Sequence, residues 1–227
     1  MRLPEWAAAA VTAFGGGVLL AAVAVELLPE ADTRAGPVTT SLCLLAGTVV
    51  YVAADARLTR EKQDKMVRRT GHAAAAGMPM AMSRSDADAA RGEAIAAGIF
   101  VDGVPESVAL GLTVAEGSVG VALLAGILIG NVVEAYGAAQ PIAMARTGRF
   151  ALVLIVLIGL ALAGATVLGA TALADAPDGL VGGAEAGAAG AVLAVISISV
   201  VPYAFDQVRW WVALALAAGF VTGYVLS

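Results

Sequence analysis

The feature of this sequence that most limits its possible folds is a succession of apolar runs, each about as long as a membrane-spanning helix, along most of the chain. As a helix, about 20 apolar residues span the hydrocarbon core of a bilayer. The composition agrees, because 60% of the residues are hydrophobic and only 14% are charged, against about 25% charged residues in an ordinary soluble domain. The sequence therefore predicts an all-α fold, a polytopic bundle of transmembrane helices.

Seven helices are expected from the apolar runs and the turn residues between them. They cover residues 6–28, 39–56, 92–115, 119–145, 150–173, 186–204 and 210–226. Residues 57–91 are the long polar segment of the chain, which we expect to be a loop and a disordered linker. No small-residue cleavage site follows a short apolar core before Ala31, so we expect a retained span and no signal peptide.

The basic residues predict an orientation. With the amino terminus in the cytoplasm, cytoplasmic segments hold twelve of the 13 Lys and Arg residues, and only Arg34 lies outside. Cytoplasmic loops are enriched in Lys and Arg, so we expect a multi-pass protein of the plasma membrane with the 57–91 loop in the cytoplasm. The outer loops would carry Asp32, Glu116, Asp175, Asp178 and Glu185. This acidic face either gathers cations or reflects only the lack of basic residues in translocated loops.

Carboxylates occur in the middle of two neighbouring apolar runs. Asp102 and Glu106 are four residues apart, which places them on one face of a helix with about 6 Å of rise between them. Pro105 cannot donate a backbone hydrogen bond, so we expect a kink that leaves a bare carbonyl beside the two acids. The next run carries Asn131 and Glu134, about one helical turn apart.

Three acids in two spans need an explanation, because a central Asp costs roughly 2.5–3.5 kcal/mol on insertion. The simplest is a divalent cation bound by Asp102, Glu106, Glu134 and the side-chain carbonyl of Asn131. An oxygen-rich set without imidazole or thiolate suits harder ions such as Mn²⁺, Fe²⁺ or Mg²⁺ and tolerates Zn²⁺. The alternatives are a buried polar network or a proton relay, with Asn131 as a structural hydrogen-bonding residue.

The motifs in these two runs resemble a known pair. Asp-Gly-Val-Pro-Glu-Ser at residues 102–107, followed by Asn-Val-Val-Glu-Ala at residues 131–135, is similar to the paired signature of the ZIP (Zrt/Irt-like) family of divalent-metal transporters. In that family the first motif usually reads His-Asn-x-Pro-Glu-Gly. The resemblance places Asp102 at the usual His position, Glu106 and Glu134 at the shared Glu positions, and Gly130 at the first ligand position of the second motif. It implies a divalent cation (Zn²⁺, Fe²⁺ or Mn²⁺) as the transported substrate and no enzymatic reaction. Neither motif retains a histidine, so zinc transport specifically is not implied.

An internal repeat adds to this plan. Residues 17–31 align with residues 190–204 at an offset of 173. The first span would run outward and the sixth inward, so the repeat would be inverted, as in many transporters that bind their substrate between the two repeats. The single domain, residues 1–227, would then contain a first repeat (6–56), the loop (57–91), a central metal-binding helix pair (92–146) and a second repeat (150–226).

The fifth span has no partner in this repeat. A complete repeat would need one more helix before Trp6, so we expect that the sequence starts downstream of a missing first helix. The rival expectation is a true seven-helix form whose exposed face is covered by lipid or by the second subunit of a homodimer. The expected partners are thus a metal ion and the bilayer, and no nucleic acid.

Other candidate residues lie outside the two motifs. Glu26, near the outer end of the first span, is either an entrance ligand or an acid that reaches the membrane surface. His72 and three methionines between positions 78 and 82 are either a metal sensor or part of a plain linker. The single cysteine, Cys43, excludes an internal disulfide and a Cys-based metal cluster.

Two other classes of function stay open beside metal transport. The same acids serve equally as a relay in an ion-coupled carrier of a small solute. A transport-inactive membrane paralogue with a regulatory or metal-binding role is the third class. Metal uptake that depends on Glu106 would separate metal transport from both.

Overall fold

The structure is a computed structural model that describes residues 4–75, 84–115, 117, 120–172 and 176–227. Each regular element in these ranges is helical, which confirms the all-α prediction. The elements are α1 (Glu5–Ala22), α2 (Leu28–Ala35), α3 (Pro37–Ala75), α4 (Arg84–Ala115), α5 (Val121–Ala145), α6 (Gly148–Ala172), α7 (Asp178–Val195), α8 (Val201–Val208) and α9 (Trp211–Leu226). Two π-helical turns, η1 (Val23–Leu27) and η2 (Ile196–Val200), join α1 to α2 and α7 to α8.

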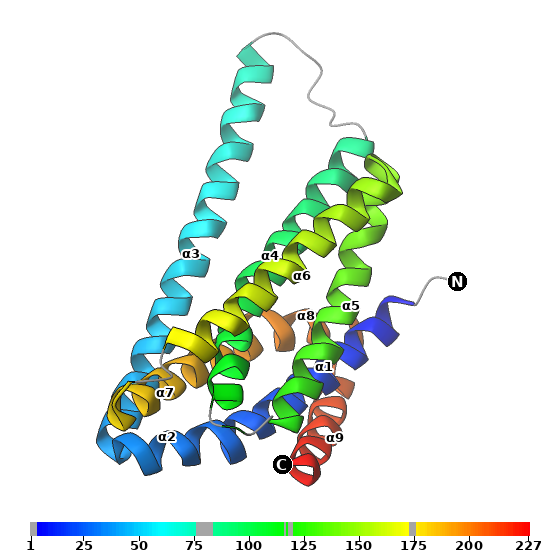
Figure 1. Cartoon of the computed structure of the whole chain (residues 1–227). Coiled ribbons are helices and arrows are strands. Elements are labelled where there is room, and N and C mark those ends of the chain that lie inside the picture. Colours follow the sequence, from blue (N-terminus) through cyan, green and yellow to red (C-terminus); the bar gives the residue numbers. More distant parts are fainter. Residues whose placement is uncertain (1–3, 76–83, 116, 118–119, 173–175) are drawn as a thin grey trace.

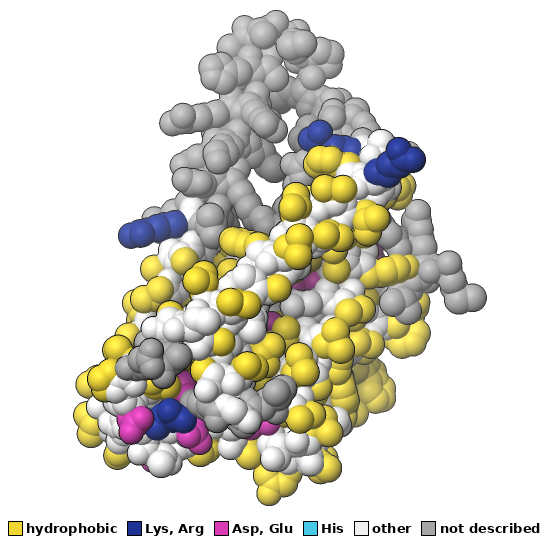
Figure 2. Space-filling model, in the orientation of Figure 1, with side chains coloured by type: hydrophobic (Ala, Val, Ile, Leu, Met, Phe, Trp, Pro, Cys, Tyr) yellow, Lys and Arg dark blue, Asp and Glu magenta, His cyan; other side chains and the backbone are white. Residues whose placement is uncertain are grey.

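Six stretches of the described chain are helices long and apolar enough to cross a membrane. They are Glu5–Ala35, Pro37–Arg57, Gly98–Ala115, Val121–Met144, Gly148–Ala172 and Asp178–Val208, and α9 is a shorter apolar helix of 16 residues. Figure 2 shows hydrophobic side chains over the flank of the helices, with clusters of charged side chains at the lower left and upper right of the view and a few acidic atoms visible between the helices. Such a surface fits a lipid environment, and the fold is that of a multi-pass helical membrane protein.

Several expected loops are helical. α3 continues past residue 56 to Ala75, and α4 already begins at Arg84, so a loop over 57–91 is wrong for residues 57–75 and 84–91. The reason is that these parts of the segment are rich in Arg, Lys and Ala, which favour helix although the charge of Arg and Lys keeps them out of lipid. His72 lies in α3, whereas Met78, Met80 and Met82 lie outside the described residues.

The expected turns around Asp32 and Asp178 are shorter than the sequence suggested. Asp32 lies inside α2, which ends at Ala35 and is followed by Gly36. This glycine has a positive φ of 77°, which is favourable just after a helix. Asp178 opens α7, where a carboxylate is stabilised by the helix dipole. Glu185 is therefore inside α7 and fully buried, not in an outer loop, while Glu116 and Asp175 lie outside the described residues.

The helices form two closely packed pairs, α1 with α9 and α3 with α7, beside a group made of α4, α5 and α6. The most extensive contacts are those of α1 with α9, α3 with α7, and α4 with α6 and α5, and α5 also contacts α1. Figure 1 shows α4, α5 and α6 side by side, and α7 beside the lower part of α3. The close pairs depend on glycine, because a Cβ on Gly17 would overlap the Leu216 carbonyl oxygen and one on Gly190 would overlap that of Leu44. Small residues of this kind let transmembrane helices approach each other.

The segment α7–η2–α8 has the same organisation as α1–η1–α2. In both, a helix of 18 residues is followed by a π-helical turn of 5 residues and a helix of 8 residues. α7 begins at Asp178 and α1 at Glu5, which are equivalent positions in the register that aligns residues 17–31 with residues 190–204. Both segments carry a proline at the start of the last helix and end at a residue with positive φ, Gly36 (77°) in one and Arg209 (53°) in the other.

Candidate cation site

Two of the four candidate ligands line one cavity between the central helices. Asp102 of α4 and Glu134 of α5 border a cavity of about 220 Å³, which we call the central cavity. Hydroxyl-bearing residues complete its polar lining, namely Thr12 of α1, Ser199 of η2 and Tyr203 of α8. Apolar side chains, among them Ile99, Val133 and Val200, form much of the remaining wall. The central cavity therefore combines two acids and three hydroxyl groups within an otherwise apolar surround.

Glu106 and Asn131 are placed differently. Glu106 is buried, with 6% of its surface exposed, and the carboxylates of Asp102 and Glu134 both act on it electrostatically. Asn131 is half-buried on α5. Neither is among the described residues that line the central cavity. Pro105 lies inside α4 next to Glu106, where its missing N–H leaves a backbone acceptor without its helical partner.

No complete metal site is assembled from acidic side chains in the part of the chain that the structure describes. There, no three His, Cys, Asp or Glu residues lie close enough together to hold a metal ion. Asp102 and Glu134 are the acids that share the central cavity, and its hydroxyl oxygens and water would have to supply the remaining ligands of a bound ion. Oxygen ligands of this kind suit hard divalent cations that keep part of their hydration shell.

A tyrosine that the sequence analysis did not single out contacts Asp102. The Tyr51 hydroxyl of α3 donates a hydrogen bond to Asp102 Oδ1, and Ser199 also interacts with this hydroxyl. Tyr51 is buried in a small apolar cluster with Ala194 and Val200. The available signal was that Tyr51 is the one aromatic residue in the sequence from 39 to 56, but only the packing of α3 on α7 decides which residue its hydroxyl reaches.

A second cavity, of about 400 Å³, lies where α4 ends and α5 begins. We call it the acidic cavity, because Glu26, Glu30 and Glu185 all line it. One Glu26 oxygen, Oε2, is buried without a hydrogen-bond partner in the described structure, and a Cβ on Gly120 would come within 2.6 Å of it. Glu26 is half-buried, and its Oε2 is directed towards Gly120, just before α5 begins.

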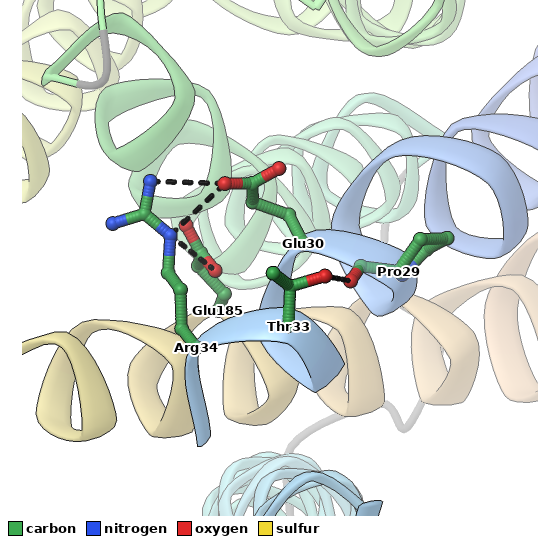
Figure 3. Close-up of polar contacts among 5 residues, drawn as sticks. All are labelled: Pro29, Glu30, Thr33, Arg34 and Glu185. Atoms are coloured by element: carbon green, nitrogen blue, oxygen red, sulfur yellow. Dashed lines mark hydrogen bonds and ion pairs between the residues drawn. The ribbon is translucent and has the colours of Figure 1, made fainter. Parts of the chain in front are cut away.

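Arg34 connects two of the acids in this cavity, as Figure 3 shows. Its Nη2 lies 3.0 Å from Glu30 Oε1, and its Nε lies 4.0 Å from Glu185 Oε2. Glu185 belongs to α7 and its side chain is 1% exposed, so this pair links α2 to α7. The Thr33 hydroxyl donates a hydrogen bond to the Pro29 carbonyl oxygen at 2.9 Å, within α2. The positive charge of Arg34 thus offsets part of the buried negative charge.

The two cavities are formed by equivalent positions of the two matched segments. In the register that aligns residues 17–31 with residues 190–204, the polar positions of the central and acidic cavities correspond as Thr12 with Glu185, Ser199 with Glu26, and Tyr203 with Glu30. Along α4, Asp102 of the central cavity and Thr113 of the acidic cavity are separated by about 16 Å of helix rise. Glu106, which is buried, lies between these two positions in the sequence of α4.

A comparison with protein-family models, with curated proteins and with solved structures finds no match to this chain. The fold and the cavities define a class: a helical, multi-pass membrane protein with acidic groups inside its helix bundle. Any narrower assignment depends on the motif residues and on the chemistry of the two cavities.

Proposed function

We propose that this protein is a ZIP-like transporter of divalent metal cations, with Asp102, Glu106, Asn131 and Glu134 as its metal-binding residues. The observation that carries the proposal is the series of acids through the bundle. Asp102 and Glu134 line the central cavity, Glu106 is buried one helical turn after Asp102 in α4, and three further Glu residues line the acidic cavity. Acids inside a membrane are costly, and they are most often found along ion pathways.

The inverted repeat and the seven helices belong to this proposal. Their support is the equal lengths of α1–η1–α2 and α7–η2–α8 and the matching contacts, because α1 packs on α9 as α7 packs on α3. α9 is counted as the seventh span although it is shorter than the other six, since Trp210 and Trp211 at its start are typical of a membrane interface. Repeats of this kind bind substrate at their interface near the bilayer centre.

The proposed location is the plasma membrane, with the segment between α3 and α4 in the cytoplasm. The support is the distribution of basic residues, which are abundant between residues 57 and 91 and also occur at Arg146 and Arg149. In this orientation the acidic cavity faces the outside, because it lies at the end of α4 farthest from that segment.

An ion-coupled carrier of a small solute is the second candidate. It is favoured by the apolar walls of the central cavity and by the lack of a three-acid cluster among the described residues. In such a carrier Asp102, Glu106 and Glu134 would bind and release a proton or Na⁺. The solute would occupy the central cavity.

Uptake by reconstituted protein separates the two candidates. Proteoliposomes are supplied with Mn²⁺, Fe²⁺ or Zn²⁺ and the internal metal is measured over time. We expect saturable uptake by the wild type and almost none by Glu106→Ala, because a buried acid of the proposed binding set is then lost. Asp32→Asn is the control, since Asp32 is an exposed carboxylate of α2, and it should transport as the wild type does. Wild-type flux in Glu106→Ala would contradict the assignment.

A further inference from the structure

Tyr51 reaches the candidate site from outside the cavity. It is 4% exposed and packs against α7 and η2 through Ala194, Val195 and Val200. Its hydroxyl donates a hydrogen bond to Asp102 Oδ1 on α4. No residue of α3 is among the described residues that line the central cavity. Tyr51 therefore contacts the acid and not the space in which a cation would lie.

A phenol that donates to a carboxylate forms a charge-assisted hydrogen bond, which is strong in a medium of low dielectric constant. Such a bond fixes the rotation of the Asp102 side chain. It also links that side chain to the α3–α7 pair, because Tyr51 is held by the cluster around Val195 and Val200. Ser199, which interacts with the same hydroxyl, lines the central cavity, as Asp102 does.

We propose that Tyr51 is a positioning residue for cation binding: it holds the Asp102 carboxylate in the orientation in which Asp102 and Glu134 share one cation. This inference rests on the proposed function. Residues that orient a metal ligand through a hydrogen bond commonly change metal affinity by about 10- to 100-fold when they are removed. Tyr51 thereby sets the affinity of the site, while Asp102, Glu106 and Glu134 supply the charge.

The repeat offers a matched control. Tyr224 of α9 occupies the position equivalent to Tyr51 of α3 in the register that relates the two matched segments. Its side chain is 62% exposed on the surface of the bundle, so its hydroxyl has no comparable place in a buried site. Tyr51→Phe and Tyr224→Phe remove the same atom, one next to Asp102 and one at the surface, and both keep the aromatic ring that packs in each helix.

The experiment measures initial rates of Mn²⁺ uptake into proteoliposomes by the wild type and the two variants. We expect Tyr51→Phe to raise KM for Mn²⁺ about tenfold, the size of effect typical of a lost positioning contact, while kcat stays within about twofold. Tyr224→Phe should leave both constants unchanged. A tyrosine needed only for packing would instead lower kcat and the amount of folded protein together, and that result would overturn the proposal.

A second readout does not require transport. In protein labelled with ¹³Cζ-tyrosine and held in nanodiscs, the Tyr51 resonance is identified by its loss in Tyr51→Phe. We expect this resonance to move in Asp102→Asn while that of Tyr224 does not, and an unmoved Tyr51 resonance would overturn the contact itself. Wild-type protein that takes up none of the three metals would overturn the proposed function. Metal uptake with the same KM in Tyr51→Phe would overturn the role of Tyr51 alone.

Discussion

Replacement of Arg34 by Gln tests the charge balance of the acidic cavity. The guanidinium of Arg34 lies between two carboxylates, with Nη2 3.0 Å from Glu30 Oε1 and Nε 4.0 Å from Glu185 Oε2. The two acids differ in their surroundings, because the Glu30 side chain is 48% exposed and that of Glu185 is 1% exposed. Loss of Arg34 leaves the charge of Glu30 in contact with solvent but leaves that of Glu185 in the interior.

The magnitude follows from these distances. Two unit charges about 4 Å apart attract each other by about 4 kcal/mol at an effective dielectric constant of about 20, and removal of one partner from a fully buried pair costs about 3–5 kcal/mol. Arg34 is 22% exposed, so solvent reduces the cost. We expect Arg34→Gln to lower the free energy of unfolding by about 1–3 kcal/mol. Glu30→Gln removes only the exposed pair and should cost less than about 1 kcal/mol.

The assay is unfolding of the purified protein in mixed micelles, followed by the loss of helical circular dichroism. It compares the wild type with Arg34→Gln, Glu30→Gln and the double variant Arg34→Gln/Glu185→Gln. In the double variant the buried carboxylate is neutral, so stability should return to within about 1 kcal/mol of the wild type. The reasoning is refuted if Arg34→Gln is as stable as the wild type, or if the double variant is no more stable than Arg34→Gln.

Two further substitutions test the site and the packing. Asp102→His should shift the metal preference of uptake towards Zn²⁺, because imidazole suits Zn²⁺ better than harder ions. Uptake with competing metals measures this preference. An unchanged order of metal preference would count against Asp102 as a ligand. Gly190→Val should destabilise the protein by about 1–3 kcal/mol or more, because a Cβ there would overlap the Leu44 carbonyl oxygen. Gly159→Val is the control, since a Cβ on Gly159 meets nothing within 4 Å. Equal unfolding midpoints for the two variants would argue against close packing of α3 and α7.

The sequence predicted the helical class because that class depends on local patterns. Runs of apolar residues decide which segments cross a membrane. Asp102 and Glu106 belong to one such run, and Asn131 and Glu134 to the next. In the structure these runs are the helices α4 and α5, which pack together. The helical extension of α3 to Ala75 was missed because high charge was interpreted as disorder, although the same residues favour helix.

The contacts of the two cavities could not be predicted in the same way. Tyr51 meets Asp102 only because α3 packs on α7 and turns one face towards α4. The sequence predicts a loop at Glu185, because a lone acid at the edge of an apolar run usually marks the end of a span. The structure buries Glu185 beside Arg34 of α2, which lies near the opposite end of the sequence and supplies the opposite charge.

The different chemistry of the two cavities gives the proposed path a direction. Equivalent positions carry hydroxyl groups around the central cavity and carboxylates around the acidic cavity. Carboxylates attract a cation over a longer distance than hydroxyl groups do. The positive charge of Arg34, beside Glu30 and Glu185, lowers the affinity of the acidic cavity for that cation. Conduction requires sites that a cation enters readily and also leaves. Under the proposed function, the acidic cavity therefore concentrates cations and releases them towards Glu106, and the central cavity, with Asp102 oriented by Tyr51, selects among them.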